Sequence, residues 1–114
     1  MVRNTERSVP KLDIQALQEA VSKNRYFITI TTHAKERMGL HKVSDEDVKQ
    51  VILSGEMIEE HPDANPFPKA LFMASFRESP LYVSCAFDGR SAYIITVHWY
   101  DPEVWVDPRT RRKQ

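Results

Sequence analysis

Apolar residues near the start of the chain recur at intervals of three and four, which is the spacing of one face of a helix. Within residues 12–24, "LDIQALQEAVSKN", this face comprises Leu12, Ala16, Leu17, Ala20 and Val21. Asp13 carries the negative charge that favours the first turn of a helix. The pattern therefore predicts a first helix over this segment.

A second helical pattern lies at residues 43–55, "VSDEDVKQVILSG". Ser44 and Asp47 have the spacing of a capping box, in which each side chain accepts a hydrogen bond from the backbone of the other residue. The acidic residues of this first turn also complement the positive end of the helix dipole. Gly55 is expected to end the helix in a left-handed conformation.

The segment between these two helices changes character in the middle. Residues 25–31, "RYFITIT", are rich in aromatic and β-branched side chains and predict a short strand. Residues 32–38, "THAKERM", contain good helix formers from Ala34 onward. With Thr32 as the N-cap and Gly39 as the stop signal, they predict a helix of about two turns.

The second half of the chain has the composition and turn signals of antiparallel strands. The predicted strands are 56–61, 70–77, 81–87 and 92–100. Three prolines keep residues 62–68 out of regular structure, "ESP" joins the middle two strands, and Asp88-Gly89 predicts a tight hairpin before the last strand.

The order of elements predicts an α+β fold. We expect two to three N-terminal helices packed on an antiparallel sheet of about four strands, to which residues 26–31 could contribute a fifth. A chain of 114 residues is long enough for one core, so residues 1–114 are interpreted as a single domain.

Alternation along the last strand divides its side chains between two faces. The predicted core set is Tyr93, Ile95, Val97 and Trp99. The other set is Ala92, Ile94, Thr96, His98 and Tyr100, and it ends in three polar groups on a face that we expect to be partly covered. Met73, Ser75 and Arg77 could share that face.

Composition narrows the class of protein. The chain is 41% hydrophobic and 28% charged, as expected of a soluble globular protein, and its apolar runs are shorter than the roughly 20 residues that span a bilayer. The N-terminus lacks the apolar core of a secretory signal, so we expect a cytoplasmic location and no membrane association.

Cys85 cannot form an internal disulfide, because it is the only cysteine, and is expected to be a small buried residue.

The charge is zero overall but unevenly distributed. Residues 1–43 carry eight Lys/Arg against four Asp/Glu, whereas residues 44–63 carry one against seven. A chain with no net charge is not a typical nucleic-acid binder. The basic tail at residues 109–114 is either a solvated end or a segment that contacts phosphates.

His33 and Arg37 are the first candidates for chemistry. They are four residues apart and would share one face of a helix. An imidazole can exchange a proton near neutral pH, and a guanidinium can stabilise an anionic transition state, which are the two abilities needed for RNA cleavage by a 2′-hydroxyl without a metal. The alternative is an ordinary helix end whose arginine pairs with a surface carboxylate.

His98 and Tyr100 form a second titratable pair on the last strand. They would meet the helix cluster across a cleft, or else be half-buried residues of a sheet edge. The four histidines lack the spacings typical of zinc sites, and each glycine is isolated, so we expect neither a metal nor a cofactor.

Four segments taken in order resemble a small bacterial family of domains of unknown function. They are "HAKERM", "VSDEDVKQVILSGEMIEEHP", "LYVSCAF" and "YIITVHW", and the likeness spans roughly residues 28–105. That family is similar to the RelE- and MqsR-like toxins of bacterial toxin–antitoxin pairs. The resemblance implies a helix-plus-curved-sheet fold, metal-independent cleavage of mRNA and inhibition by an antitoxin protein. It places His33 and Arg37 at motif positions, and Thr96 and His98 in the closing strand.

The leading hypothesis is therefore a toxin-like endoribonuclease of a type II pair. His33 would be the general base or acid, Arg37 the charge stabiliser and His98 the complementary proton donor. The predicted RNA-binding residues are Lys35, Arg77, Thr96, Tyr100, Arg109, Arg111 and Arg112. The alternative is a non-catalytic module of the same fold that binds a protein partner, and the acidic segment 45–63 favours it because that segment repels RNA.

Overall fold

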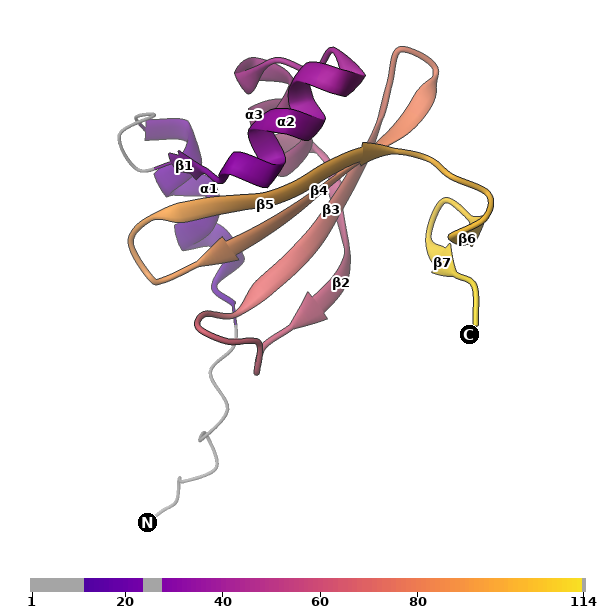
Figure 1. Ribbon diagram of the computed structural model, residues 1–114. Coiled ribbons are helices and arrows are strands. Elements are labelled where there is room, and N and C mark those ends of the chain that lie inside the picture. The colour runs from indigo at the N-terminus through magenta and orange to yellow at the C-terminus, as the bar shows by residue number, and fades with distance from the viewer. Residues whose placement is uncertain (1–11, 24–27, 114) are drawn as a thin grey trace.

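A computed structural model describes residues 12–23 and 28–113 and has three helices, a five-stranded sheet and a two-stranded sheet (Figure 1). The elements are α1 Ile14–Lys23, β1 Ile28–Ile30, α2 Thr32–His41, α3 Asp45–Ser54, β2 Glu56–His61, β3 Lys69–Phe76, β4 Ser79–Phe87, β5 Ala92–Trp99, β6 Trp105–Asp107 and β7 Thr110–Arg111. The predicted α+β class is confirmed.

The large sheet has the strand order β1-β5-β4-β3-β2. It has five strands where about four were predicted, with β1 as the possible fifth, and it is mixed and not antiparallel, because β1 pairs in parallel with β5 while every other pair is antiparallel. The helices are also not all N-terminal to the sheet, since β1 lies between α1 and α2. A composition rich in β-branched residues predicts a strand but not the direction in which it pairs.

The predicted ends of α2 were wrong at both sides. Thr31, not Thr32, is the N-cap, because its hydroxyl accepts the hydrogen bond of the Ala34 N–H at 3.1 Å. The helix continues through Gly39 to His41, and Lys42 supplies the left-handed C-cap with φ 58°. The helix is therefore ten residues long, which extends its polar face by one turn.

The start of α3 is as predicted, and its end is not. The capping box is present, with Asp47 N to Ser44 Oγ at 3.1 Å and Ser44 N to Asp47 Oδ2 at 2.9 Å. Gly55 has an extended backbone, φ −86°, and is not left-handed. A Cβ at this position would lie 2.3 Å from the carbonyl oxygen of Val51 and 2.7 Å from that of Met73, so glycine is required by the close approach of two backbones.

Three local features near the chain's other turns also differ from prediction. Asp13 precedes α1 and accepts a hydrogen bond from Ala16 N at 3.0 Å, so it acts as a cap and not as a first-turn residue. Arg77 and Glu78, both with positive φ, form the β3–β4 turn in place of "ESP". Asp88 organises a four-residue loop to Ser91 by accepting two backbone hydrogen bonds, so the Asp-Gly pair is not a two-residue turn.

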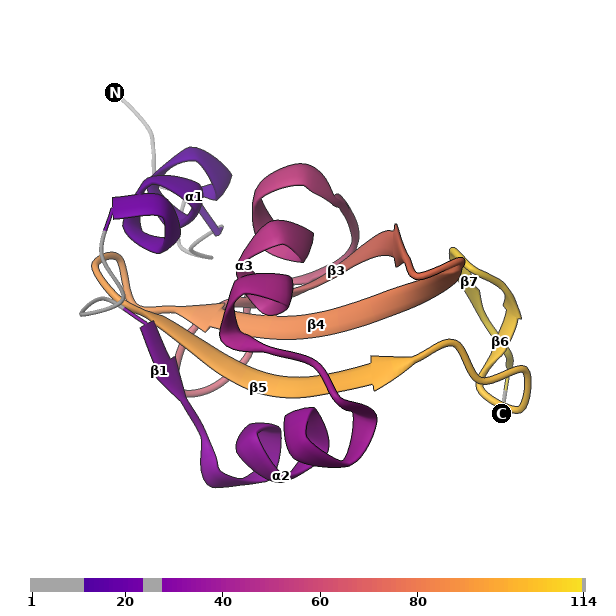
Figure 2. The ribbon, with the colours of Figure 1, turned by 90° about the horizontal axis from the view of Figure 1, so that it is seen from above.

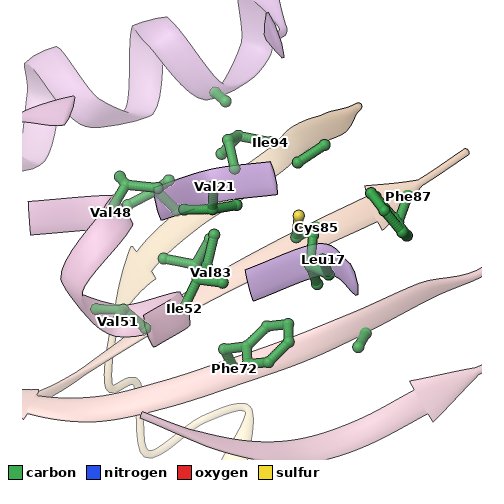
Figure 3. Close-up of a cluster of buried hydrophobic side chains, with 14 of the residues drawn as sticks. Leu17, Val21, Val48, Val51, Ile52, Phe72, Val83, Cys85, Phe87 and Ile94 are labelled. Atoms are coloured by element: carbon green, nitrogen blue, oxygen red, sulfur yellow. The ribbon is translucent and has the colours of Figure 1, made fainter. Parts of the chain in front are cut away.

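One face of the sheet, here called the helix face, is covered by α1 and α3 and holds the main core (Figures 1 and 3). Leu17 and Val51 pack over Phe72, Val83 and other side chains that point up from the strands. Cys85 is part of this core, as predicted, and burial raises the pKa of its thiol to about 12.

The opposite face, here called the open face, carries a smaller cluster. Leu71 and Met73 of β3 and Tyr82 of β4 pack there against Trp105 of β6. The C-terminal β6–β7 hairpin thus covers one end of the open face and leaves the rest of it uncovered by helices (Figure 1).

A β-bulge in β5 changes which of its residues are buried. Ser84 pairs with Thr96 but Cys85 pairs with Ile94, so Ile95 is the extra residue. Ala92 and Ile94 are fully buried on the helix face, which corrects the prediction that Tyr93 and Ile95 are core. Beyond the bulge the alternation is as predicted, with Val97 in the core and His98 on the open face.

Candidate functional site

A cavity of about 700 Å³ lies over the open face, between α2 and the β6–β7 hairpin. All four histidines of the chain line it: His33, His41, His61 and His98. We call it the histidine cavity. Its other polar lining residues are Arg37, Glu59, Lys69, Ser84, Thr96, Tyr100, Asp101 and Arg111.

Helix α2 forms one wall of the histidine cavity because it runs alongside β5 (Figure 2). At its start, Thr31 N donates to the carbonyl oxygen of Ile94 at 3.1 Å. At its end, Trp99 Nε1 donates to the carbonyl oxygen of His41 at 3.3 Å. The edge of β5 is available to α2 because β1 pairs only with Ala92 to Ile94.

The sequence of α2 divides its faces cleanly. Ala34 and Met38 are buried against the sheet. His33, Arg37 and His41 follow each other at intervals of four residues, so they form one row on the side of the helix that borders the cavity.

His98 is a partly enclosed titratable group of the cavity wall. Its ring is half-buried and stacks on Tyr82 with the centroids 5.2 Å apart, and Tyr82 stacks in turn on Trp105 at 4.6 Å. Burial, which disfavours the charged form, lowers the pKa of His98; the hydrogen bond to the Trp99 carbonyl opposes this shift, and electrostatic interactions with Arg111, His41 and Arg37 add to it.

The hydrogen bond of His98 decides which ring nitrogen carries the proton. Nδ1 lies 3.3 Å from the carbonyl oxygen of Trp99, and a carbonyl can only accept, so Nδ1 is the donor. Nε2 of the neutral ring then keeps its lone pair. A neutral imidazole of this kind is suited to accept a proton, whereas the sequence hypothesis made His98 a proton donor.

The β6–β7 hairpin is the second wall and is anchored by several contacts. The Tyr82 hydroxyl donates to the carbonyl oxygen of Pro108 at 2.8 Å, and burial raises the pKa of Tyr82 to about 12, so this donor stays protonated. Arg111 lies over the Trp105 ring and makes two hydrogen bonds to Glu59, at 2.9 and 3.0 Å. The basic tail is therefore held in a hairpin up to Arg111 and is not a frayed end, although its residues are exposed.

The structure brings six of the ten sequence-predicted site residues to the histidine cavity. These are His33, Arg37, Thr96, His98, Tyr100 and Arg111. The Tyr100 hydroxyl also donates to the carbonyl oxygen of Trp105 at 3.4 Å, which ties the end of β5 to the hairpin.

The other four predicted residues lie outside the cavity. Lys35 borders a separate hollow beside Ile30. Arg77, in the β3–β4 turn, donates to the carbonyl oxygen of Lys42 at 3.1 Å and pairs with Asp47, so it does not share the open face as expected. Arg109 is paired with Glu56 at 2.9 Å, and Arg112 donates to the carbonyl oxygen of Pro102.

Sequence reasoning missed His41, His61 and Lys69, which also line the cavity. The signal for His41 was present, since it continues the four-residue spacing of His33 and Arg37. It went unused because Gly39 was expected to end the helix. His61 and Lys69 pair across β2 and β3, and nothing in their local sequence indicates which face they occupy.

In residues 12–23 and 28–113 no three His, Cys, Asp or Glu side chains are grouped in a way that could hold a metal ion. Within the same described ranges, no helix has the length and apolar character needed to cross a membrane.

Comparison with known proteins gives one family. A family model described as "Domain of unknown function (DUF4258)" matches residues 30–99, from the end of β1 to the end of β5. No curated protein and no solved structure matches the chain. The matched span includes His33, Arg37, His41 and His98, while Tyr100 and Arg111 follow it.

Proposed function

Because the chain belongs to the DUF4258 family, whose description assigns no activity, we propose a function from the histidine cavity: metal-independent cleavage of single-stranded RNA, as in the RelE- and MqsR-like toxins that the sequence resembles. One observation carries this proposal. Residues from α2, β2 and β5 gather four histidines and Arg37 around one cavity, although they are spread over 66 residues of sequence.

The reaction requires a base, an acid and a stabiliser of negative charge. The base removes the proton of a 2′-hydroxyl, the 2′-oxygen attacks the adjacent phosphorus, and the 5′-oxygen leaves with a proton from the acid. The products are a 2′,3′-cyclic phosphate and a 5′-hydroxyl. His98 suits the base because its neutral ring, with the proton on Nδ1, carries a lone pair on Nε2, and Arg37 suits the stabiliser because a guanidinium binds two phosphoryl oxygens at once.

The acid comes from α2 in this proposal. His33 is the residue that the sequence analysis named, and it lines the cavity on the same helix face as Arg37. In this assignment His98 is the neutral base and the residue of α2 is the protonated acid. The role of His98 is therefore the reverse of the one first given to it, but the reaction is the same.

Binding of an RNA strand is supported by the rest of the lining. Arg37 and Lys69 supply positive charge, Arg111 is already paired with Glu59, and Asp101 supplies negative charge. The Trp99 and Tyr100 rings also border the cavity, and aromatic faces stack on bases regardless of sequence. Thr96 and Tyr100 offer hydroxyl groups to the sugar or phosphate. Lys35, Arg77, Arg109 and Arg112 have no part in this site.

A second candidate function is that of a non-catalytic module that binds a protein partner. The apolar surface away from the histidine cavity favours it. Ile28 and Ile30 of the edge strand β1 border two hollows, one beside α1 and α3 and one beside α2. A protein partner that covered them, such as an antitoxin, would leave the cavity untouched. Retention on heparin at moderate salt separates the candidates, because a module for protein partners flows through.

The test is incubation of the purified protein with a long single-stranded RNA in EDTA. The double variant His33→Ala, His98→Ala is compared with wild type, and Lys35→Ala serves as a matched control on α2 outside the cavity. We expect cleavage by wild type and the control, none by the double variant, and melting temperatures within a few degrees of each other. Absence of cleavage by wild type, or equal cleavage by the double variant, would rule the proposal out.

A further inference from the structure

We propose that His41, and not His33, is the general acid that pairs with His98, so that the α2 row is ordered as His33, then Arg37, then His41 along the bound RNA. This inference rests on the proposed function and assigns a role to a residue that sequence reasoning overlooked.

The first argument is the register of α2 against β5. The start of α2 is fixed at Ile94 and Ile95, to which Thr31 donates through N and Oγ1. The end of α2 is fixed at Trp99, whose indole donates to the carbonyl oxygen of His41. Helix and strand therefore run in the same direction, and the end of one lies beside the end of the other (Figure 2).

The second argument is the length of the row. Four residues of helix rise about 6 Å, so the Cα atoms of His33 and His41 are about 12 Å apart along the helix. His98 lies three residues beyond Ile95, which is about 10 Å along the strand. Counted from Thr31, which lies beside Ile95, His33 is about 3 Å and His41 about 15 Å along the helix, so His98 lies level with Arg37 and nearer in level to His41 than to His33.

The third argument is electrostatic. In addition to the effect of burial, Arg111 from β7 and His41 and Arg37 from α2 lie close enough to His98 to lower its pKa. The imidazoles at 41 and 98 also share the cavity with Tyr100, which follows His98 by two residues.

The order of the row gives each residue a role. His98 Nε2 takes the proton of the 2′-hydroxyl as the bond between the 2′-oxygen and phosphorus forms. The imidazolium of His41 gives its proton to the 5′-oxygen as the bond between phosphorus and that oxygen breaks. Arg37, one turn before His41, binds the oxygens of the reacting phosphoryl group, and His33, a further turn away, contacts a neighbouring phosphate.

The test uses two RNA oligonucleotides that differ in one atom. In one of them the 5′-oxygen at the scissile position is replaced by sulfur, and a thiolate leaves without needing a proton, so this substrate does not require the acid. For His41→Ala we expect a rate about 10²- to 10⁴-fold below wild type on the oxygen substrate, and a rate near that of wild type on the sulfur substrate. His98→Ala should stay slow on both.

Folding is controlled in the same experiment. The bond from Trp99 goes to the backbone of His41, so His41→Ala keeps it, and His41→Asn provides a second variant with a polar side chain. Rescue of His33→Ala by sulfur, with none for His41→Ala, would overturn the assignment while leaving the ribonuclease in place. A wild type that cleaves neither substrate would overturn the proposed function, and this inference with it.

Discussion

The two faces of the sheet are built from neighbouring residues of the same strands, yet they differ in what they bury. On β4, Val83 is fully buried beneath the helices, while the next residue, Ser84, lines the histidine cavity. On β5, Val97 and His98 divide in the same way. A strand that alternates its side chains can thus support a core on one face and a polar cavity wall on the other, and changes on one face should leave the other face intact.

Trp105 gives the strongest test of this difference between the two faces, because it is buried in the small hydrophobic cluster of the open face. Its ring is fully buried against Tyr82, and its indole N–H has no hydrogen-bond partner among the described residues. Trp105→Ala should lower the free energy of unfolding by about 3–5 kcal/mol. Trp105→Phe should cost much less, because it removes the unpartnered donor while keeping a ring. Urea denaturation of both variants is the measurement, and equal losses would contradict this.

Leu81 tests the helix face by itself. It is fully buried in the main core, so Leu81→Ala should lower the unfolding free energy by about 2–5 kcal/mol. Ser84→Ala, on the same strand but on the open face, should change it by less than about 0.5 kcal/mol. Any RNA cleavage per folded molecule should survive Leu81→Ala, measured well below its melting temperature. A selective loss of activity in that variant would show that the two faces are not independent.

We expect the free energy of unfolding to depend on pH because of His98. Its pKa in the folded protein lies below the ordinary 6.5, because burial and electrostatic interactions with Arg111, His41 and Arg37 oppose protonation. The His98 ring also stacks on Tyr82 and shares the cavity with Tyr100. Below about pH 6.5 the unfolded chain takes up a proton that the folded chain refuses, so this contribution to stability is complete above that pH and is lost as pH falls towards the folded pKa.

The slope cannot exceed about 1.4 kcal/mol per pH unit for one proton. Urea denaturation between pH 5 and pH 8 should show a smaller slope for His98→Asn than for wild type. Identical slopes would mean that His98 is not protected from protonation by its surroundings.

Glu59 is expected to have the smallest effect. It holds Arg111 of the hairpin, but about half of the arginine side chain is exposed, so the pair is largely screened by water. Glu59→Gln should therefore cost only about 0.5 kcal/mol, and less at high salt. Arg111 lowers the pKa of Glu59, so in wild type this contribution is present above about pH 4.5 and is lost as pH falls through the folded pKa. Thermal melting at two salt concentrations measures it.

Local signals in the sequence predicted most of the elements because those signals act over a few residues. The capping box at Ser44 and the strands after residue 55 are examples. The bulge at Ile95, the parallel pairing of β1 and the glycine requirement at position 55 were beyond such reasoning. The first two depend on backbones that are distant in sequence, β4 and β5, and the third depends on β3 together with the nearby carbonyl of Val51.

The candidate site was half predictable for the same reason. Spacing on one helix linked His33 with Arg37, and alternation placed His98 beside Thr96 on the side away from Val97. Positive charge alone was a poor guide to the RNA-binding residues. Arg77 and Arg109 were proposed as RNA contacts, but the fold brings a carboxylate partner to each of them, Asp47 and Glu56.

The most direct test of the two-face account is an NMR titration of histidine ring and methyl signals with a 2′-O-methyl RNA oligonucleotide, which cannot be cleaved through its 2′-oxygen. We predict that the signals of His33, His41 and His98 shift together while the core methyl signals of Leu17 and Val51 stay in place. Unchanged histidine signals, or shifts gathered around Ile28 and Ile30 on β1, would contradict it.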